Sequence, residues 1–154
     1  MSCIEMLLEH NYAVREPILD TLKQLTLEEL NRPEEEIMCR SIWELLIHLI
    51  ETERYWISIL RDEEPLILNR KALVSLDDIS RAMADAERET RMYLRELDQD
   101  VLFHVKSVRW GDQTVSFTVK KALVHMATHE IHHRGLIVGL IRQLGYKPPN
   151  VDML

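Results

Sequence analysis

The segment that decides the fold of this chain reads HMATHEIHHRG over residues 125–135, and it contains four of the seven histidines. Apolar residues recur around it at intervals of three and four, which predicts one long amphipathic helix. At about 100° per residue, the imidazoles of His129 and His133 lie one above the other on the same face of that helix. The apolar stripe consists of Val119, Leu123, Met126, Ile137, Ile141 and Leu144.

Two polar residues, Glu130 and His133, interrupt this apolar stripe. Burial of an ionisable group without a partner is costly, so we expect the stripe to open onto a cavity here, or a metal ion to compensate the polar groups. The alternative interpretation is a hydrogen-bonded core histidine, because a single histidine on an apolar face more often has that role.

Length and composition indicate a single domain over residues 1–154 with a self-sufficient core. Hydrophobic residues make up 46% of the chain, with only 4 glycines and 5 prolines, which is typical of an ordered, mostly helical protein. Lys and Arg number 19 against 26 Asp and Glu, so the formal net charge is −7. Because the positive charges are scattered, we expect no binding to nucleic acid or to anionic membranes.

The amino terminus lacks a charged segment followed by an apolar one, and no apolar run approaches the ~20 residues of a membrane span. Cys3 and Cys39 do not have the spacing of a disulfide framework. We therefore expect a cytoplasmic protein in a reducing compartment, with Cys39 buried and inert.

Helix starts are marked by a Ser or Thr that is followed three residues later by an acidic residue, the signature of a capping box. The pairs are Ser2 with Glu5, Thr26 with Glu29, Ser41 with Glu44, and Ser75 with Asp78. Together with the apolar periodicity they predict four long helices, with a kink or break at Pro17. The expected ranges are 3–25, 42–61, 76–97 and 117–144.

The connections between these helices complete the predicted fold. Residues 62–74 contain Pro65 and end at the Ser75 cap, so we expect a long crossover between the second and third helices. β-branched residues on both sides of Gly111-Asp112 predict a small β-hairpin between the third and fourth helices. The fold class is therefore all-α: a four-helix bundle of antiparallel-type helices.

The second helix supplies a third candidate metal ligand. Its circumference is mostly apolar, but His48 lies on the flank of the apolar arc in one strip with Thr52 and Tyr55. His48 can therefore face another helix and join His129 and His133 around one ion. Glu53 falls inside the same arc, where it would orient a ligand or, more often, form a salt bridge on the helix surface.

Residues 129–133 also match H-E-x-x-H, in which two helical histidines bind zinc and the glutamate activates water in metalloproteases. Zincins normally take a further ligand downstream, but after His133 this chain has no histidine or glutamate and only Asp152. The metzincin extension fails because Leu136 and Gly139 occupy the places of its glycine and third histidine. A hydrolase of this type is therefore the less favoured interpretation.

The whole-chain pattern resembles the DinB-like family. The residues that carry the resemblance are SIWELLIHL at 41–49, HMATH at 125–129 leading into HRG at 133–135, and LGYKPP at 144–149. The resemblance implies a small helical bundle, often homodimeric, with a divalent metal held by His48, His129 and His133. Many members have glutamine after His-Arg-Gly, where this chain has Leu136.

Three neutral imidazoles leave a divalent cation with open coordination positions, as in catalytic sites, and such a cation acidifies bound water or a bound thiol. Some relatives use low-molecular-weight thiols such as bacillithiol or mycothiol, so the resemblance implies a thiol S-transferase acting on a small-molecule substrate. A metal-dependent hydrolase is the other enzymatic form. Zinc, nickel, copper and iron all suit three imidazoles.

Glu130 is the candidate catalytic base in the histidine helix. The alternative for Glu130 is an ion pair with Arg134 at i+4. His125 and His132 lie toward the flank of the stripe and are expected to be dispensable for the metal. For the whole protein, the competing hypothesis is a non-enzymatic bundle, stabilised by the metal, that acts as an interaction or stress-response protein.

Overall fold

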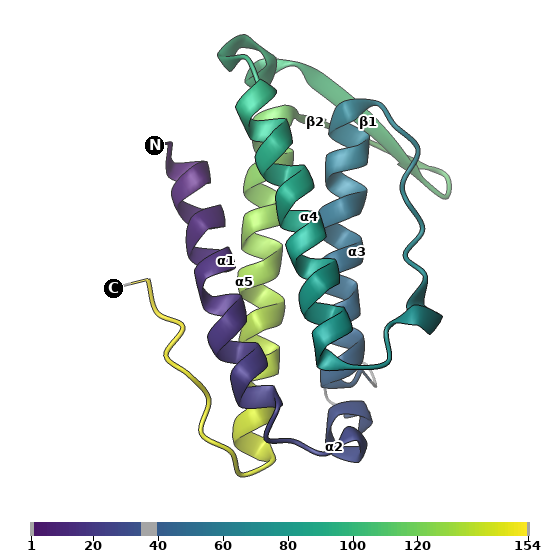
Figure 1. Ribbon diagram of the computed structural model, residues 1–154. Helices are drawn as coiled ribbons and strands as arrows, with labels where there is room; N and C mark the ends of the chain where they lie inside the picture. The colour runs from purple at the N-terminus through teal and green to yellow at the C-terminus, as the bar shows by residue number, and fades with distance from the viewer. Residues whose placement is uncertain (1, 35–39, 154) are drawn as a thin grey trace.

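The computed structural model describes residues 2–34 and 40–153. Four long helices form a bundle (Figure 1): α1 (Cys3–Leu22), α3 (Ile42–Arg61), α4 (Leu76–Glu96) and α5 (Val119–Gln143). The smaller elements are α2 (Leu27–Asn31), the 3-10 helices η2 (Arg70–Ala72) and η3 (Gln99–Phe103), and the strands β1 (Val105–Trp110) and β2 (Gln113–Thr118). The predicted four-helix bundle with a crossover and a hairpin is confirmed, whereas Cys39 lies outside the described residues.

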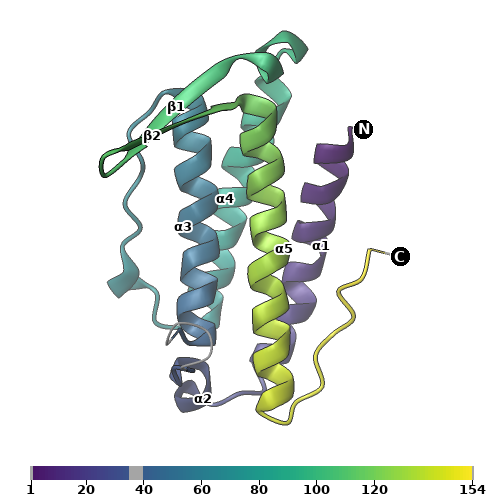
Figure 2. The same ribbon diagram turned by 180° about the vertical axis from the view of Figure 1, so that it is seen from behind.

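The long helices form a ring in which α3 packs against α4 and α5, and α1 packs against the same two helices from the other side. Figures 1 and 2 show that α1 and α5 run in one direction, whereas α3 and α4 run in the other. The neighbours α1 and α5 are therefore parallel, as are α3 and α4, which differs from the antiparallel-type arrangement expected. The cause is the crossover over residues 62–74, which returns along the bundle so that α4 begins at the same end as α3.

The helix starts follow the capping signals. Ser2, Thr26 and Ser75 each form both hydrogen bonds of a capping box. At Ser41 the hydroxyl accepts a hydrogen bond from the backbone N–H of Glu44. These bonds satisfy N–H groups that have no partner within the helix, which fixes where each helix begins.

Of the kink or break predicted at Pro17, the break does not occur, because α1 continues through this residue to Leu22. A proline inside a helix removes the N–H that would bond the carbonyl four residues earlier, here that of Ala13. Ala13 and Pro17 are both on the exposed side of α1, so water can bond the freed carbonyl.

The core consists of two apolar clusters. One lies toward α2 and includes Leu22, Leu46 and Ile137, and the other lies toward the hairpin and includes Leu8, Trp56 and Met126. A polar layer separates them along all four long helices. This polar layer consists of Asn11, Arg15, Glu53, Thr90, Glu130 and Arg134, together with the hydroxyl of Tyr12, whose ring belongs to the cluster toward the hairpin.

The hairpin closes one end of the bundle. Strand β1 pairs antiparallel with β2, and Gly111 takes a positive φ of 59° in the turn between them. Val108 and Phe117 are buried against the helices, and the Phe117 ring lies 5.3 Å from that of Trp56. The β-branched run that begins at Val101 becomes strand only from Val105, because residues 99–103 form η3. In the described part of the chain, no helix combines the length and apolar character needed to span a membrane.

Candidate metal centre

Three histidines from two helices converge on one point at the level of the polar layer. His48 comes from α3, and His129 and His133 come from successive turns of α5. The Nε2 atom of His129 lies 3.2 Å from Nε2 of His48 and 3.1 Å from Nε2 of His133. The ligand atoms of the three side chains all lie within 4.8 Å of one another. The structure therefore brings together the three residues that the sequence singled out as ligands.

The spacing of these nitrogens fits a shared divalent cation. With metal–nitrogen bonds of about 2.1 Å and a tetrahedral angle, two ligand nitrogens lie about 3.4 Å apart. Hydrogen bonds among the three rings explain these short distances less well than a shared cation does. The Nε2 of His129 carries either one proton or one lone pair in the ring plane, so it bonds well to only one of its two neighbours. Binding of the cation itself stays a prediction.

Electrostatics keep these imidazoles in the neutral form that binds metal. Burial, followed by the neighbouring imidazoles, lowers the pKa of His129 and that of His133 to about 4. Burial and then the positive charge of Arg40 also lower the pKa of His48. Near pH 7 the ring nitrogens are therefore available as ligands.

The other histidines of α5 have different surroundings. His125 and His132 are exposed, whereas His129 and His133 are half-buried. The ring of His125 lies 5.2 Å from that of Trp56, and the ring of His132 lies 5.0 Å from that of His133. Both rings therefore border the metal centre without joining its group of ligand atoms.

Glu130, the predicted base, lies in the polar layer and is only 7% exposed. Its Oε1 accepts a hydrogen bond of 2.8 Å from Nε of Arg15, and its Oε2 accepts one of 2.6 Å from Nη2. The alternative partner expected for Glu130, Arg134, instead donates to Asn11 Oδ1 at 2.8 Å. With both oxygens held by Arg15, the geometry favours a structural role for Glu130 over that of a base.

Glu53 forms a salt bridge as expected, but in the core rather than on the helix surface. Its Oε2 accepts from Nη2 of Arg15 at 2.6 Å, and its Oε1 accepts from the hydroxyls of Tyr12 at 2.8 Å and Thr90 at 2.7 Å. Arg15 on α1 thus binds both helices that carry the candidate ligands. Burial lowers the pKa of Arg15, but the carboxylates of Glu53 and Glu130 outweigh that effect and raise it.

The sequence interpretation missed Arg15 and Asn11. The signal for them is the periodicity of α1, because Asn11 and Arg15 occupy core-facing positions between Leu8 and Ile18. Such interruptions of an apolar stripe are the same type of signal that drew attention to Glu130. Arg15 pairs with Glu130, which lies 115 residues further along the chain, so local spacing does not reveal this pairing.

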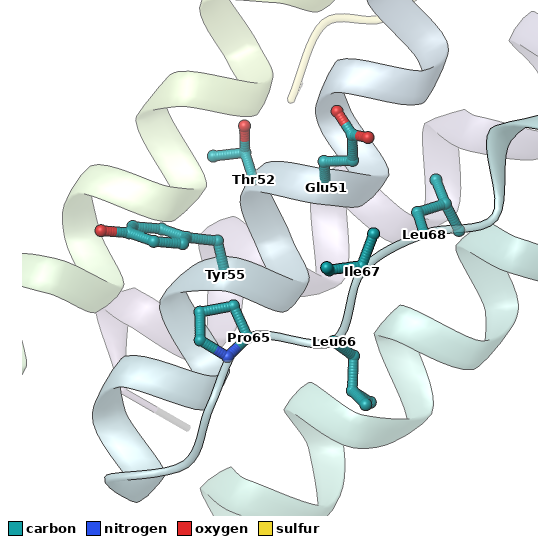
Figure 3. A pocket seen from close by; sticks show the side chains of 7 residues that line it. All are labelled: Glu51, Thr52, Tyr55, Pro65, Leu66, Ile67 and Leu68. Atoms are coloured by element: carbon teal, nitrogen blue, oxygen red, sulfur yellow. The ribbon is translucent and has the colours of Figure 1, made fainter.

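A pocket of about 370 Å³ lies between α3 and the crossover, and it begins at Glu51 and Thr52, one helical turn after His48. Figure 3 shows its lining, with Glu51, Thr52 and Tyr55 from α3 and residues 65–68 from the crossover. The Tyr55 hydroxyl accepts a hydrogen bond of 2.9 Å from Nε1 of Trp110, which fixes the ring at the hairpin end of the pocket. None of the three candidate ligands lines this pocket; helical spacing along α3 relates it to His48.

This chain belongs to the DinB family, whose family model matches residues 1–154. The Bacillus subtilis (strain 168) protein YizA is 25% identical to it over 146 residues, which cover 95% of this chain and 91% of that protein. The resemblance drawn from the histidine segments is therefore confirmed.

Solved structures show the same fold. A conserved protein from Enterococcus faecalis is 22% identical, with a TM-score of 0.71 over 92% of this chain and 96% of that chain. YfiT from Bacillus subtilis, described as a probable metal-dependent hydrolase with an unusual four-helix bundle topology, is 16% identical, with a TM-score of 0.70 over 96% and 91%. The DinB-like protein YjoA from the same organism is 17% identical, with a TM-score of 0.66 over 95% and 96%.

Proposed function

We propose that this protein is a divalent-metal-dependent enzyme in which His48, His129 and His133 hold the cation. The observation that carries the proposal is the convergence of three Nε2 atoms at spacings of 3.1 and 3.2 Å from that of His129. A divalent cation held by three neutral imidazoles lowers the pKa of water or of a small thiol at its open positions. The substrate is a small molecule, and the cation is zinc, nickel or iron.

The surrounding residues support substrate binding at this centre. The three imidazoles remain neutral, so they leave the charge of a cation uncompensated. Tyr55 lies two helical turns after His48 on the same side of α3. It lines the pocket between α3 and the crossover, where its hydroxyl can orient a bound molecule. Half-burial of the ligands limits access of bulk water, which strengthens electrostatic interactions at the site.

Two reactions fit this centre, and they differ in the nucleophile. Transfer of a low-molecular-weight thiol is the form suggested by the family resemblance. Hydrolysis is supported by YfiT, which is described as a probable metal-dependent hydrolase. A zincin-like hydrolysis with Glu130 as base is not favoured, since Arg15 holds both oxygens of that carboxylate.

A non-enzymatic, metal-tied bundle is the alternative, and the polar layer weighs against it. Arg15 already links α1, α3 and α5 through Glu53 and Glu130, so the bundle has a cross-helix tie that needs no metal. We further propose that the protein acts as a homodimer in the cytoplasm, as the sequence led us to expect.

Elemental analysis of the protein purified from its native host tests the proposal first. We expect about one equivalent of a divalent metal in the wild-type protein and loss of that metal in His48→Ala. His104→Ala is the matched control, because His104 is exposed and is not part of the histidine group. The metal-loaded protein is then screened for thiol transfer and for ester and amide hydrolysis. Metal-free wild-type protein, or retention of the metal by His48→Ala, would contradict the proposed site.

A further inference from the structure

The pocket between α3 and the crossover continues the strip of α3 that begins at His48. Glu51, Thr52 and Tyr55 follow His48 at i+3, i+4 and i+7, so all four side chains lie along one side of the helix. The last three line the pocket, and residues 65–68 of the crossover cover its other side (Figure 3). The pocket therefore begins one helical turn from His48, on the side of α3 that carries this candidate ligand.

Residues 65–68 of the crossover form an apolar wall of the pocket. Two of their side chains lie outside the core. Leu66 is 66% exposed and Ile67 is 97% exposed. The crossover is anchored on α3 by Arg70, whose Nε and Nη2 donate to the two carboxylate oxygens of Glu51 at 2.7 and 2.5 Å. Exposed apolar surface is unfavourable in water, and a bound apolar group would remove it from water.

The polar groups around the pocket leave no unbalanced charge. Glu51 is neutralised by its two-point ion pair with Arg70, which occupies both carboxylate oxygens. Tyr55 uses its oxygen to accept from Trp110, so its own proton remains available for an acceptor on a ligand. A charged ligand group would find no opposite charge here to offset its loss of hydration.

We propose that this pocket binds an uncharged, apolar arm of the small molecule whose reacting group lies at the histidine centre. This inference rests on the proposed function, because it requires a bound cation with an open position. The volume of about 370 Å³ lies at the lower end of the range of small-molecule sites, about 300–1,000 Å³. The arm is therefore a short alkyl chain or a single ring.

A series of alkyl hydroxamates tests the proposal. Each carries the same metal-binding head, and the alkyl tail lengthens from acetohydroxamate to octanohydroxamate. We expect calorimetric titration of the zinc-loaded protein to show the Kd falling by up to about fourfold for each buried methylene, until the pocket is full.

Two variants of the crossover identify where the tail binds. Ile67→Asp places a charge in the pocket wall, whereas Val74→Asp places one at a residue that is also exposed (72%) and outside the lining. We expect Ile67→Asp to abolish the dependence on tail length and to leave the Kd for acetohydroxamate within about twofold. Val74→Asp keeps the wild-type dependence.

The outcomes separate this inference from the proposed function. Failure of acetohydroxamate to bind the zinc-loaded protein would overturn the open metal site, and the pocket proposal with it. Binding of acetohydroxamate with no gain from longer tails would overturn the pocket proposal alone. So would equal behaviour of Ile67→Asp and Val74→Asp.

Discussion

His132 and His133 are adjacent in sequence, but α5 gives them different positions. His133 is half-buried, and its Nε2 lies 3.1 Å from that of His129. His132 is exposed, with its ring 5.0 Å from that of His133. One residue of helix rotation, about 100°, thus separates a candidate ligand from a residue at the border of the site.

We expect His133→Ala to lose the metal and His132→Ala to retain about one equivalent of it, because two remaining imidazoles bind a divalent cation far more weakly than three. Metal content after gel filtration, measured by elemental analysis, checks this result. The register assigned to α5 would be wrong if His132→Ala lost the ion and His133→Ala kept it.

A pH dependence of stability follows from the same residues. In the folded metal-free protein the pKa of His129 is about 4, whereas the ordinary value is 6.5. The unfolded chain therefore binds the proton first as the pH falls, and protonation favours unfolding. The histidine contributes no penalty well above pH 6.5, and the penalty develops between 6.5 and about 4.

We expect the free energy of unfolding of the metal-free protein to fall across this pH range, and to fall less steeply in His129→Gln. Urea unfolding at several pH values from 7.5 to 4.5, in the presence of a chelator, measures the difference. Comparison with the variant removes the contribution of the carboxylates, which is common to both proteins. Parallel curves for the two proteins would show that His129 is not held neutral in the folded state.

At the level of the elements, α1 holds both ligand-bearing helices although it contributes no candidate ligand. Arg15 bonds Glu53 of α3 and Glu130 of α5 at 2.6 Å each, and all three side chains are nearly inaccessible to solvent. Loss of the guanidinium would leave two carboxylates buried together. The attraction between Arg15 and the two carboxylates and the cost of removing these charges from water are both large. Removal of Arg15 alone therefore lowers the free energy of unfolding more than removal of all three charges.

Arg15→Leu is expected to lower the free energy of unfolding by about 3–5 kcal/mol. Combining it with Glu53→Gln and Glu130→Gln should restore a large part of this loss, because the buried charges are then removed. The matched control is Arg91→Leu, which breaks partly exposed ion pairs on the same bundle and should cost at most about 1 kcal/mol. Urea unfolding of the four proteins provides the values. Equal effects of Arg15→Leu and Arg91→Leu would contradict the role assigned to Arg15.

The sequence predicts some features of these elements better than others. Capping signals place the starts of α1, α3 and α4, because the N-cap bonds are local. The direction of α4 is not local. The 13 residues of the 62–74 crossover can span about 43 Å when extended, more than the roughly 30 Å of a 20-residue helix, so the chain is long enough to return. Length permits the parallel α3–α4 pair but does not impose it.

In the candidate site, too, features that depend on local sequence are predicted, whereas those that depend on tertiary packing are not. Histidine spacing on α5 and the flank position of His48 depend on helical periodicity, so the sequence places these residues correctly on their helices. The role of Glu130 depends on Arg15, which is distant in sequence and comes into contact only through tertiary packing. The sequence of the H-E-x-x-H segment by itself therefore does not show that both oxygens of Glu130 are bonded by Arg15.

For the whole molecule, the polar layer and the histidines lie at the same level between the two apolar clusters. Both clusters draw residues from α1, α3, α4 and α5, so neither cluster can separate without disrupting the same four helices. We expect the protein to unfold in one cooperative transition. A cation that binds only the folded protein would then stabilise the entire molecule rather than one end of it.

The dependence of the melting temperature on free metal concentration tests this coupling. Above the Kd, each tenfold increase in free zinc adds about 1.4 kcal/mol to the free energy of unfolding. For a chain of 154 residues, whose unfolding entropy is about 0.3 kcal/mol/K, this corresponds to about 4 °C per decade. Calorimetric scans in zinc buffers should show a single transition with this slope, whereas the transition of His48→Ala should not move. Two separate transitions, with only one dependent on zinc, would mean that the apolar clusters unfold independently and that the polar layer does not couple them.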